Sequence, residues 1–145
     1  MAINVTEYKS MFDINGTDEY FGWSTSLSAD GKIVAVGAVG GHSTGCVKVY
    51  KWDLTIENNW TQVGADINGE AAGDLSGVSV SLSGDGKTVA IGAFGNDGTT
   101  GPDSDSGHVR VFTLKNSNWV QVGIELDGEG SGDCSGYSVS LSNDG

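Results

Sequence analysis

Acidic side chains are the residues of this sequence whose types and spacing could do chemistry. In "NDGTTGPDSDSG", residues 96–107, Asp103 and Asp105 alternate as in calcium-binding loops, and Asp97 is near enough along the chain to join them. Calcium takes about six to eight oxygen ligands, several of them from carboxylates. The loop is therefore a candidate metal site with calcium as its cofactor, although a plain surface loop explains the same residues.

A second set of acids recurs in two similar stretches, "DINGEAAGD" (66–74) and "ELDGEGSGD" (125–133). Its candidate binding residues are Asp66, Glu70, Asp74, Asp127, Glu129 and Asp133. They predict an acidic face for divalent cations or a basic partner, with none of the bases beside them. The alternative is that these acids sit in solvated bends, where Asp and Gly are favoured for local reasons.

No group of residues in the sequence has the pattern of a catalytic site. His42 and His108 are the only histidines, and neither has a nucleophile beside it in a known motif. The serines of "SVSLS" (79–83) alternate along a strand and lack the G-x-S-x-G elbow of a hydrolase. The sequence predicts that this chain is not an enzyme.

Charge and hydropathy exclude further classes of function. Nineteen acids against seven bases give a net charge of −12 across 145 residues, which disfavours nucleic acid as a partner because phosphate binding needs clustered Lys and Arg. No apolar run approaches the roughly 18 residues of a membrane span. The first residues, "MAINVTEYKS", contain no apolar signal-peptide core. Neither nucleic-acid binding nor membrane insertion is expected.

The elements that carry these acids belong to a repeat. "FGWSTSLSADGKIVAVGAVG" begins at residue 21, "SGVSVSLSGDGKTVAIGAFG" at 76 and "SGYSVSLSNDG" at 135. Their glycines Gly22, Gly77 and Gly136 are separated by 55 and 59 residues (22 to 77, 77 to 136). Repetition at such a period is typical of solenoids and propellers.

Each repeat reads as four antiparallel strands. In the second repeat they are 77–83, 87–93, 107–114 and 118–126, and in the first the last two are 45–52 and 59–67. The serines of the first strand alternate with apolar residues, which indicates two different faces. Val47, Val49, Val109 and Val111 are expected to point inward, and Lys48 and Arg110 outward. The loops between second and third strands and the connections after the fourth strand should share one end of the unit, which gathers the acids there.

We therefore predict an all-β fold made of β-propeller blades, as four-stranded units around an axis have this signature. Residues 1–145 form a single repeat region, with a stray fourth strand and connection (1–21), two repeats (22–76 and 77–135) and the first strand of a third (136–145). A two-sheet sandwich is the competing fold. Because about four to eight blades close a propeller, we expect an incomplete one, either a piece of a longer chain or a unit whose copies assemble.

The repeat resembles the FG-GAP repeat. Phe21-Gly22 with Gly37-Ala38 carry the resemblance, and Gly77 with Gly92-Ala93 repeat it more loosely, although Val39 and Phe94 stand where the family has proline. The resemblance implies an integrin-α-like propeller of the kind found in bacterial, algal and giant-virus surface proteins, and an extracellular, cell-surface or virion-surface location. It also implies calcium held by a D-x-D-x-D-G loop between strands one and two. Here those loops, "SADGK" (28–32) and "SGDGK" (83–87), have one carboxylate and one lysine each, so the family's metal site is not expected.

Three functions follow from this reading. The first is non-enzymatic surface recognition, adhesion or assembly through the loops, with a protein or glycan ligand. The second is a structural building block that assembles through its sheet edges, its partners being other blades in the same chain or copies of the chain. The third is a lectin-like propeller. Four tryptophans are the candidates for stacking on sugars, although packing between blades is their alternative role: Trp23, Trp52, Trp60 and Trp119.

Overall fold

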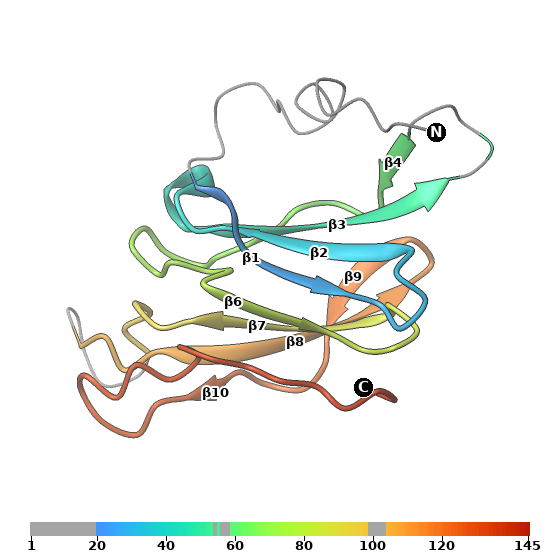
Figure 1. The fold of residues 1–145 in the computed structure, drawn as a ribbon. Helices are drawn as coiled ribbons and strands as arrows, with labels where there is room; N and C mark the ends of the chain where they lie inside the picture. The colour runs from blue at the N-terminus through green and yellow to red at the C-terminus, as the bar shows by residue number, and fades with distance from the viewer. Residues whose placement is uncertain (1–19, 54, 56–58, 99–103) are drawn as a thin grey trace.

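A computed structural model of the chain describes residues 20–53, 55, 59–98 and 104–145. These residues form two antiparallel sheets with the same connectivity, and their only helical element is the single 3₁₀ turn Gly41–Ser43 (Figure 1). The first sheet contains β1 (Phe21–Leu27), β2 (Ile33–Ala38), β3 (Cys46–Asp53), β4 (Asn59–Gln62) and β5 (Ile67–Asn68). The second contains β6 (Ser79–Leu82), β7 (Thr88–Ala93), β8 (His108–Lys115), β9 (Asn118–Gln121) and β10 (Leu126–Asp127). The all-β prediction is confirmed.

The predicted fourth strand is wrong as one continuous strand. In the first sheet it is divided into β4 and β5, and both pair with β3. The amide of Val63 still donates to the carbonyl of Val49 (2.7 Å), but Gly64 then adopts a φ of +74°. A left-handed residue interrupts the strand and redirects the chain, which glycine does without steric cost. The second sheet repeats this break at Gly123.

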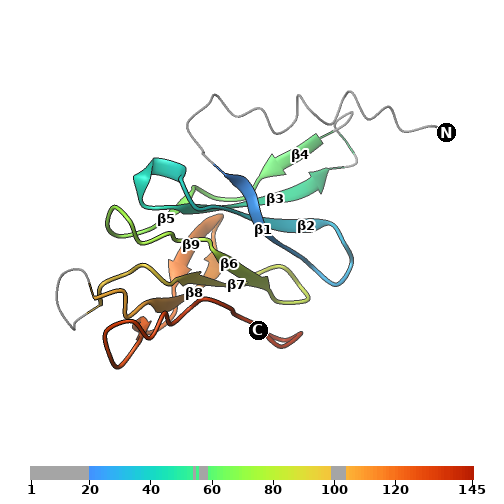
Figure 2. The same cartoon turned by 60° about the vertical axis from the view of Figure 1, so that its left-hand side comes forward.

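The two sheets pack face to face, as both views of the ribbon show (Figures 1 and 2). The first sheet contributes Ala35, Val47, Val49 and Ile67 to the apolar core. The second sheet contributes Val80, Leu82, Val89, Ile91 and Phe112. Trp119 packs against this core, and its indole N–H donates to the carbonyl of Val63 in the first sheet (2.8 Å). Burial of these side chains is the main stabilising term between the sheets.

Serines of the first strand join each repeat to the next. Ser24 Oγ donates to the carbonyl of Gly77 (2.7 Å), and the amide of Leu82 donates to Ser26 Oγ (2.9 Å). One repeat later, Ser79 Oγ donates to the carbonyl of Gly136 (2.7 Å), and the amide of Leu141 donates to Ser81 Oγ (2.9 Å). The polar face of the "SVSLS" strand therefore binds the following repeat rather than solvent.

The prediction that Lys48 and Arg110 lie on solvent-exposed faces is wrong, and Val109 and Val111, predicted to point into the core, are only half-buried. Lys48 and Arg110 are both buried, with about 6% of each residue exposed. The face of β8 that carries Arg110 packs against the first sheet, and Arg110 Nη2 donates to the carbonyl of Asn68 there (2.7 Å). Strand alternation separates two faces but does not say that either is open.

Residues 136–145 form no strand, contrary to the prediction of a first strand for a third repeat. They follow the second sheet through the serine contacts above and through Gly84, whose amide donates to the carbonyl of Asn143 (2.8 Å). A first strand pairs with the second strand of its own repeat, as β1 does with β2 and β6 with β7, and residues 136–145 have no such neighbour among the described residues. The predicted stray strand within 1–21 falls almost entirely outside the described residues.

The described part of the chain is an open stack of two sheets rather than a closed barrel or propeller, as an incomplete propeller would be. It contains no helix long and apolar enough to cross a membrane.

Candidate functional site

The loops that carry the acids meet at one end of the stack, as predicted. The amide of Gly73, in the connection after β5, donates to the carbonyl of Ser43 (3.1 Å), and that of Gly132 donates to Ser104 (2.7 Å). The tight turns between the first two strands meet at the opposite end, where the amide of Ala29 donates to the carbonyl of Gly84 (2.9 Å). Connections from both repeats therefore build one surface.

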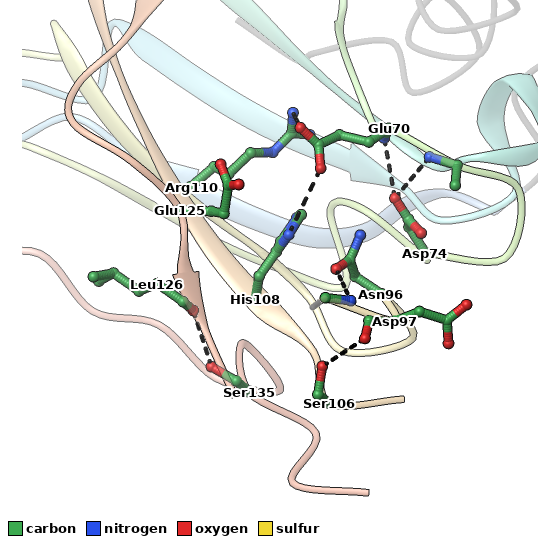
Figure 3. Close-up of polar contacts among 12 residues, drawn as sticks. Glu70, Asp74, Asn96, Asp97, Ser106, His108, Arg110, Glu125, Leu126 and Ser135 are labelled. Atoms are coloured by element: carbon green, nitrogen blue, oxygen red, sulfur yellow. Dashed lines mark hydrogen bonds and ion pairs between the residues drawn. The ribbon is translucent and has the colours of Figure 1, made fainter. Parts of the chain in front are cut away.

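A cavity of about 260 Å³ lies at this surface, between the connection after β5 and the β7–β8 loop. Figure 3 shows Glu70 and Asp74 on one side and Asp97 on the other, with His108 between them. Its titratable lining residues are Glu70, Asp74, Asp97, Glu125, Asp127 and His108. Three of the six predicted binding-face residues are thus brought together.

Two of the predicted binding-face residues, Asp74 and Asp133, accept hydrogen bonds from backbone amides of their own connections. Asp74 Oδ2 accepts the amides of Glu70 (3.0 Å) and Ala71 (2.9 Å). Asp133 repeats this one unit later by accepting the amide of Gly130 (2.7 Å). These contacts are bends closed by an acidic side chain, the alternative that the sequence left open. Asp133 and Glu129 are exposed and lie outside the cavity lining.

Asp66 belongs to a separate cluster with a base. Gln62 Nε2 donates to Asp66 Oδ1 (2.6 Å), and the Lys48 ammonium lies 3.4 Å from Oδ2. Burial raises the pKa of Asp66, but these two partners, together with a hydrogen bond to His42, outweigh it and leave the pKa below its usual value. The expectation that no base joins the acidic face is wrong, because Lys48, a buried residue of β3, forms this ion pair with Asp66.

Arg110 is the second base at this face. Its Nη1 lies 3.6 Å from Glu70 Oε1, and its guanidinium stacks over the Phe112 ring at 5.3 Å from the centroid. Arg110 thus links the second sheet to the connection of the first. Of the cavity's carboxylates, Glu70 is the one with this charge partner.

His108 forms the buried part of the cavity lining, with 1% of the residue exposed. Neither ring nitrogen has a hydrogen-bond partner among the described residues, and the nearest acid, Glu70 Oε2, lies 3.9 Å from Nδ1. Burial, and then the charge of Arg110, lower the pKa of His108, and the surrounding carboxylates oppose this only in part. The imidazole is therefore neutral at neutral pH, with one nitrogen that donates and one that accepts.

Calcium binding by the β7–β8 loop stays a prediction. Asp97 Oδ1 accepts the amides of Ser104 (2.7 Å) and Asp105 (3.3 Å), while Asp103 lies outside the described residues. Within the ranges that the structure describes, no three His, Cys, Asp or Glu side chains are arranged to hold a metal ion. Asp97 instead organises the loop that borders the cavity.

The turns after β1 and β6 have no surplus ligands for a metal. Asp85 Oδ1 accepts Ser83 Oγ (2.8 Å) and the amide of Lys87 (2.9 Å). Asp30 makes the same two bonds in the first repeat. These hydrogen bonds lower the pKa of both carboxyl groups. In both repeats the single carboxylate of the loop closes its turn.

Sequence reasoning gave His108 and Arg110 no role at this surface. The signal for His108 was a difference between repeats, because His108 stands where the first sheet has the buried Cys46. An ionisable side chain at a position that is otherwise buried and nonpolar indicates a specific local requirement. Only the packing of one sheet on the other places it beside the carboxylates.

Comparison with known proteins identifies one segment. A family model described as the FG-GAP repeat matches residues 67–112, from β5 into β8. No curated protein matches the chain. The matched segment contains the β5–β6 connection, β6, β7, the β7–β8 loop and β8 as far as Phe112, and thus much of the cavity lining.

Proposed function

This chain is an FG-GAP-like repeat protein, and we propose that it is a non-enzymatic assembly module whose sheets are propeller blades. FG-GAP repeats are typically non-catalytic and are characteristic of integrin-like propellers. The part of the second sheet's outer face that residues 136–145 leave uncovered, around Val122 and Leu126, is a stacking surface for the first sheet of a second copy of the chain. The observation that carries the proposal is that residues exposed on this face correspond to residues that the first sheet buries.

The correspondence follows from the repeat. Val122 and Leu126 occupy the positions of Val63 and Ile67, which pack at the contact between the two sheets. Yet Leu126 is 62% exposed and Val122 is 49% exposed. Contiguous apolar residues at a sheet surface are characteristic of an interaction surface.

The first sheet has the complementary surface. Leu27, Val34, Val36 and Trp60 line an open, almost wholly apolar cavity of about 390 Å³. Their counterparts in the second sheet are Leu82, Val89, Ile91 and Trp119, which are packed against the first sheet. The exposed apolar residues on one copy's second sheet therefore match the open apolar cavity on another copy's first sheet. Such a head-to-tail contact closes a ring or extends a filament, depending on its rotation.

The internal contact predicts the geometry of the external one. Trp119 donates its indole N–H to the carbonyl of Val63 across the two sheets. By the same relation, Trp60 of one copy should donate to the carbonyl of Val122 in the next. The tryptophans are then packing residues, which favours assembly over a lectin-like function. Trp52 and Trp60 already pack edge to face, with centroids 5.3 Å apart.

Light scattering coupled to size exclusion tests the proposal over a range of concentrations. We expect a mass of two or more chains, each of 14.9 kDa. Full burial of a valine contributes about 1.5–3 kcal/mol, so Val122→Glu should weaken association at least tenfold. Ala72→Glu adds the same charge at an exposed connection and should leave the mass unchanged.

A folded monomer at all concentrations would overturn the proposal, as would equal dissociation by both variants.

The proposed location is extracellular, at a cell or virion surface, because FG-GAP repeats usually occur in extracellular proteins. Detection of the chain on intact cells or particles of its source, with an antibody that cannot enter them, would support this. Confinement of the chain to the interior would refute it.

A further inference from the structure

We propose that the cavity around His108 binds an organic cation through its N–H groups, either an amine or the basic side chain of a partner protein. This site is separate from the sheet faces assigned to assembly. It lies at the loop end of the stack and is lined by both repeats. Three observations carry the assignment: charge, an unpaired buried imidazole, and the spread of the acceptors.

The charge of the lining selects a cation. Five carboxylates border the cavity, and Glu70 is held beside the Arg110 guanidinium at 3.6 Å. Asp74 uses one oxygen to close its bend but keeps its charge. A concave surface lined by one sign of charge concentrates ions of the opposite sign.

His108 supplies the second, independent observation. The large majority of buried side-chain polar atoms in proteins have a hydrogen-bond partner. His108 is fully buried at the cavity, its two ring nitrogens have no hydrogen-bond partner in the described part of the chain, and its closest acid is 3.9 Å away. A neutral imidazole offers a lone pair to an incoming N–H donor. A bound ammonium or guanidinium group satisfies it.

The positions of the acceptors distinguish an organic cation from a metal ion. A calcium ion needs oxygens that converge on one point. Here the described acidic and histidine side chains form no such group of three or more. Acceptors spread around a cavity suit a ligand with several N–H donors on a planar or tetrahedral head.

The volume limits the ligand to something small. At about 260 Å³ the cavity is below the usual 300–1,000 Å³ of sites for drug-sized molecules. It accommodates one lysine or arginine side chain or a short amine. A folded loop or a peptide backbone does not fit, so a protein partner would insert a single side chain.

Side-chain ¹H–¹⁵N spectra of the two histidines provide a direct readout. The chain is titrated with 1,4-diaminobutane, with agmatine, with Nα-acetyl-lysine amide and, separately, with calcium chloride. We expect saturable shifts of the His108 signals with the organic cations, while the signals of His42 stay in place. Tighter binding of the lysine amide indicates a protein partner, and tighter binding of the diamine indicates a free amine.

Two variants make the result specific. Asp127→Asn removes a lining charge and should weaken binding about tenfold, whereas Glu129→Gln makes the same charge change outside the lining and should not alter it. Three results would overturn the proposal: no shift of His108 at millimolar amine, a response to calcium alone, or equal effects of the two variants. Repeating the titration on Val122→Glu separates this outcome from any failure of the assembly proposal.

Discussion

Gly37→Ala should destabilise the chain strongly because of the way the two sheets approach each other. A Cβ built on Gly37 meets the carbonyl oxygen of Gly77 well inside van der Waals contact, and it meets Ser24 Oγ at 2.5 Å. The carbonyl belongs to the backbone of the following repeat and cannot rotate away. The hydroxyl donates to that same carbonyl, so the substitution also breaks this bond.

The magnitude combines two terms. Overpacking by a methyl group costs roughly 1–3 kcal/mol, and the lost hydrogen bond costs about 0.5–1.5 kcal/mol. A total of about 2–4 kcal/mol corresponds to a fall of several degrees in the melting midpoint, at about 2–4 °C per kcal/mol for a chain near this size.

Urea denaturation followed by tryptophan fluorescence measures the free energy of unfolding. Gly130→Ala is the matched control, because its Cβ meets nothing closer than 3.6 Å. Gly92→Ala tests the same contact one repeat later, against the carbonyl of Gly136. We expect a smaller loss there because residues 136–145 are outside the ladder and can yield. If Gly37→Ala is as stable as Gly130→Ala, the face-to-face packing of the sheets is wrong.

Three further outcomes are expected. Trp119→Phe leaves the carbonyl of Val63 without its donor and should lower stability by about 1 kcal/mol in denaturation, more than the same change at Trp23, which is 59% exposed; equal losses would refute the inter-sheet role. Because the pKa of His108 lies below 6.5 in the folded chain, the unfolded chain binds more protons as pH falls through 6.5, so stability should drop there. Thermal melts of His108→Asn should lack that drop, and an unchanged pH profile would count against a neutral buried ring. Since the pKa of Asp85 is lowered from 3.8 by its turn, the stability that it contributes is present above pH 3.8 and is lost below. Asp85→Asn should therefore melt earlier at pH 7, with the difference shrinking in acid; a constant difference would contradict this.

The sequence predicted the sheets because their information is local. Alternation of Val80 and Leu82 with serines marks a strand with two unlike faces, and Asp-Gly pairs mark the turns between strands. The break in the fourth strand was missed because Gly64 follows an apparently regular run. A single left-handed residue leaves little trace in a hydrophobic pattern.

What covers a face is not local information. Arg110 has the spacing of an outward residue, and it does point away from Val109 and Val111. A second sheet covers that side, which no pattern within β8 records. His108 likewise acquired its role from neighbours more than 30 residues earlier, Glu70 and Asp74, so the acidic end was predictable but the buried imidazole within it was not.

The central claim is that a second copy stacks on the open face of the second sheet, and a photo-cross-linker at position 60 tests it most directly. Replacing Trp60 by benzoylphenylalanine puts the reactive ketone where the indole should meet the next copy. Irradiation followed by mass spectrometry should give dimeric products joined between position 60 and residues 120–126. Products confined to single chains, or joined at other surfaces, would contradict the account.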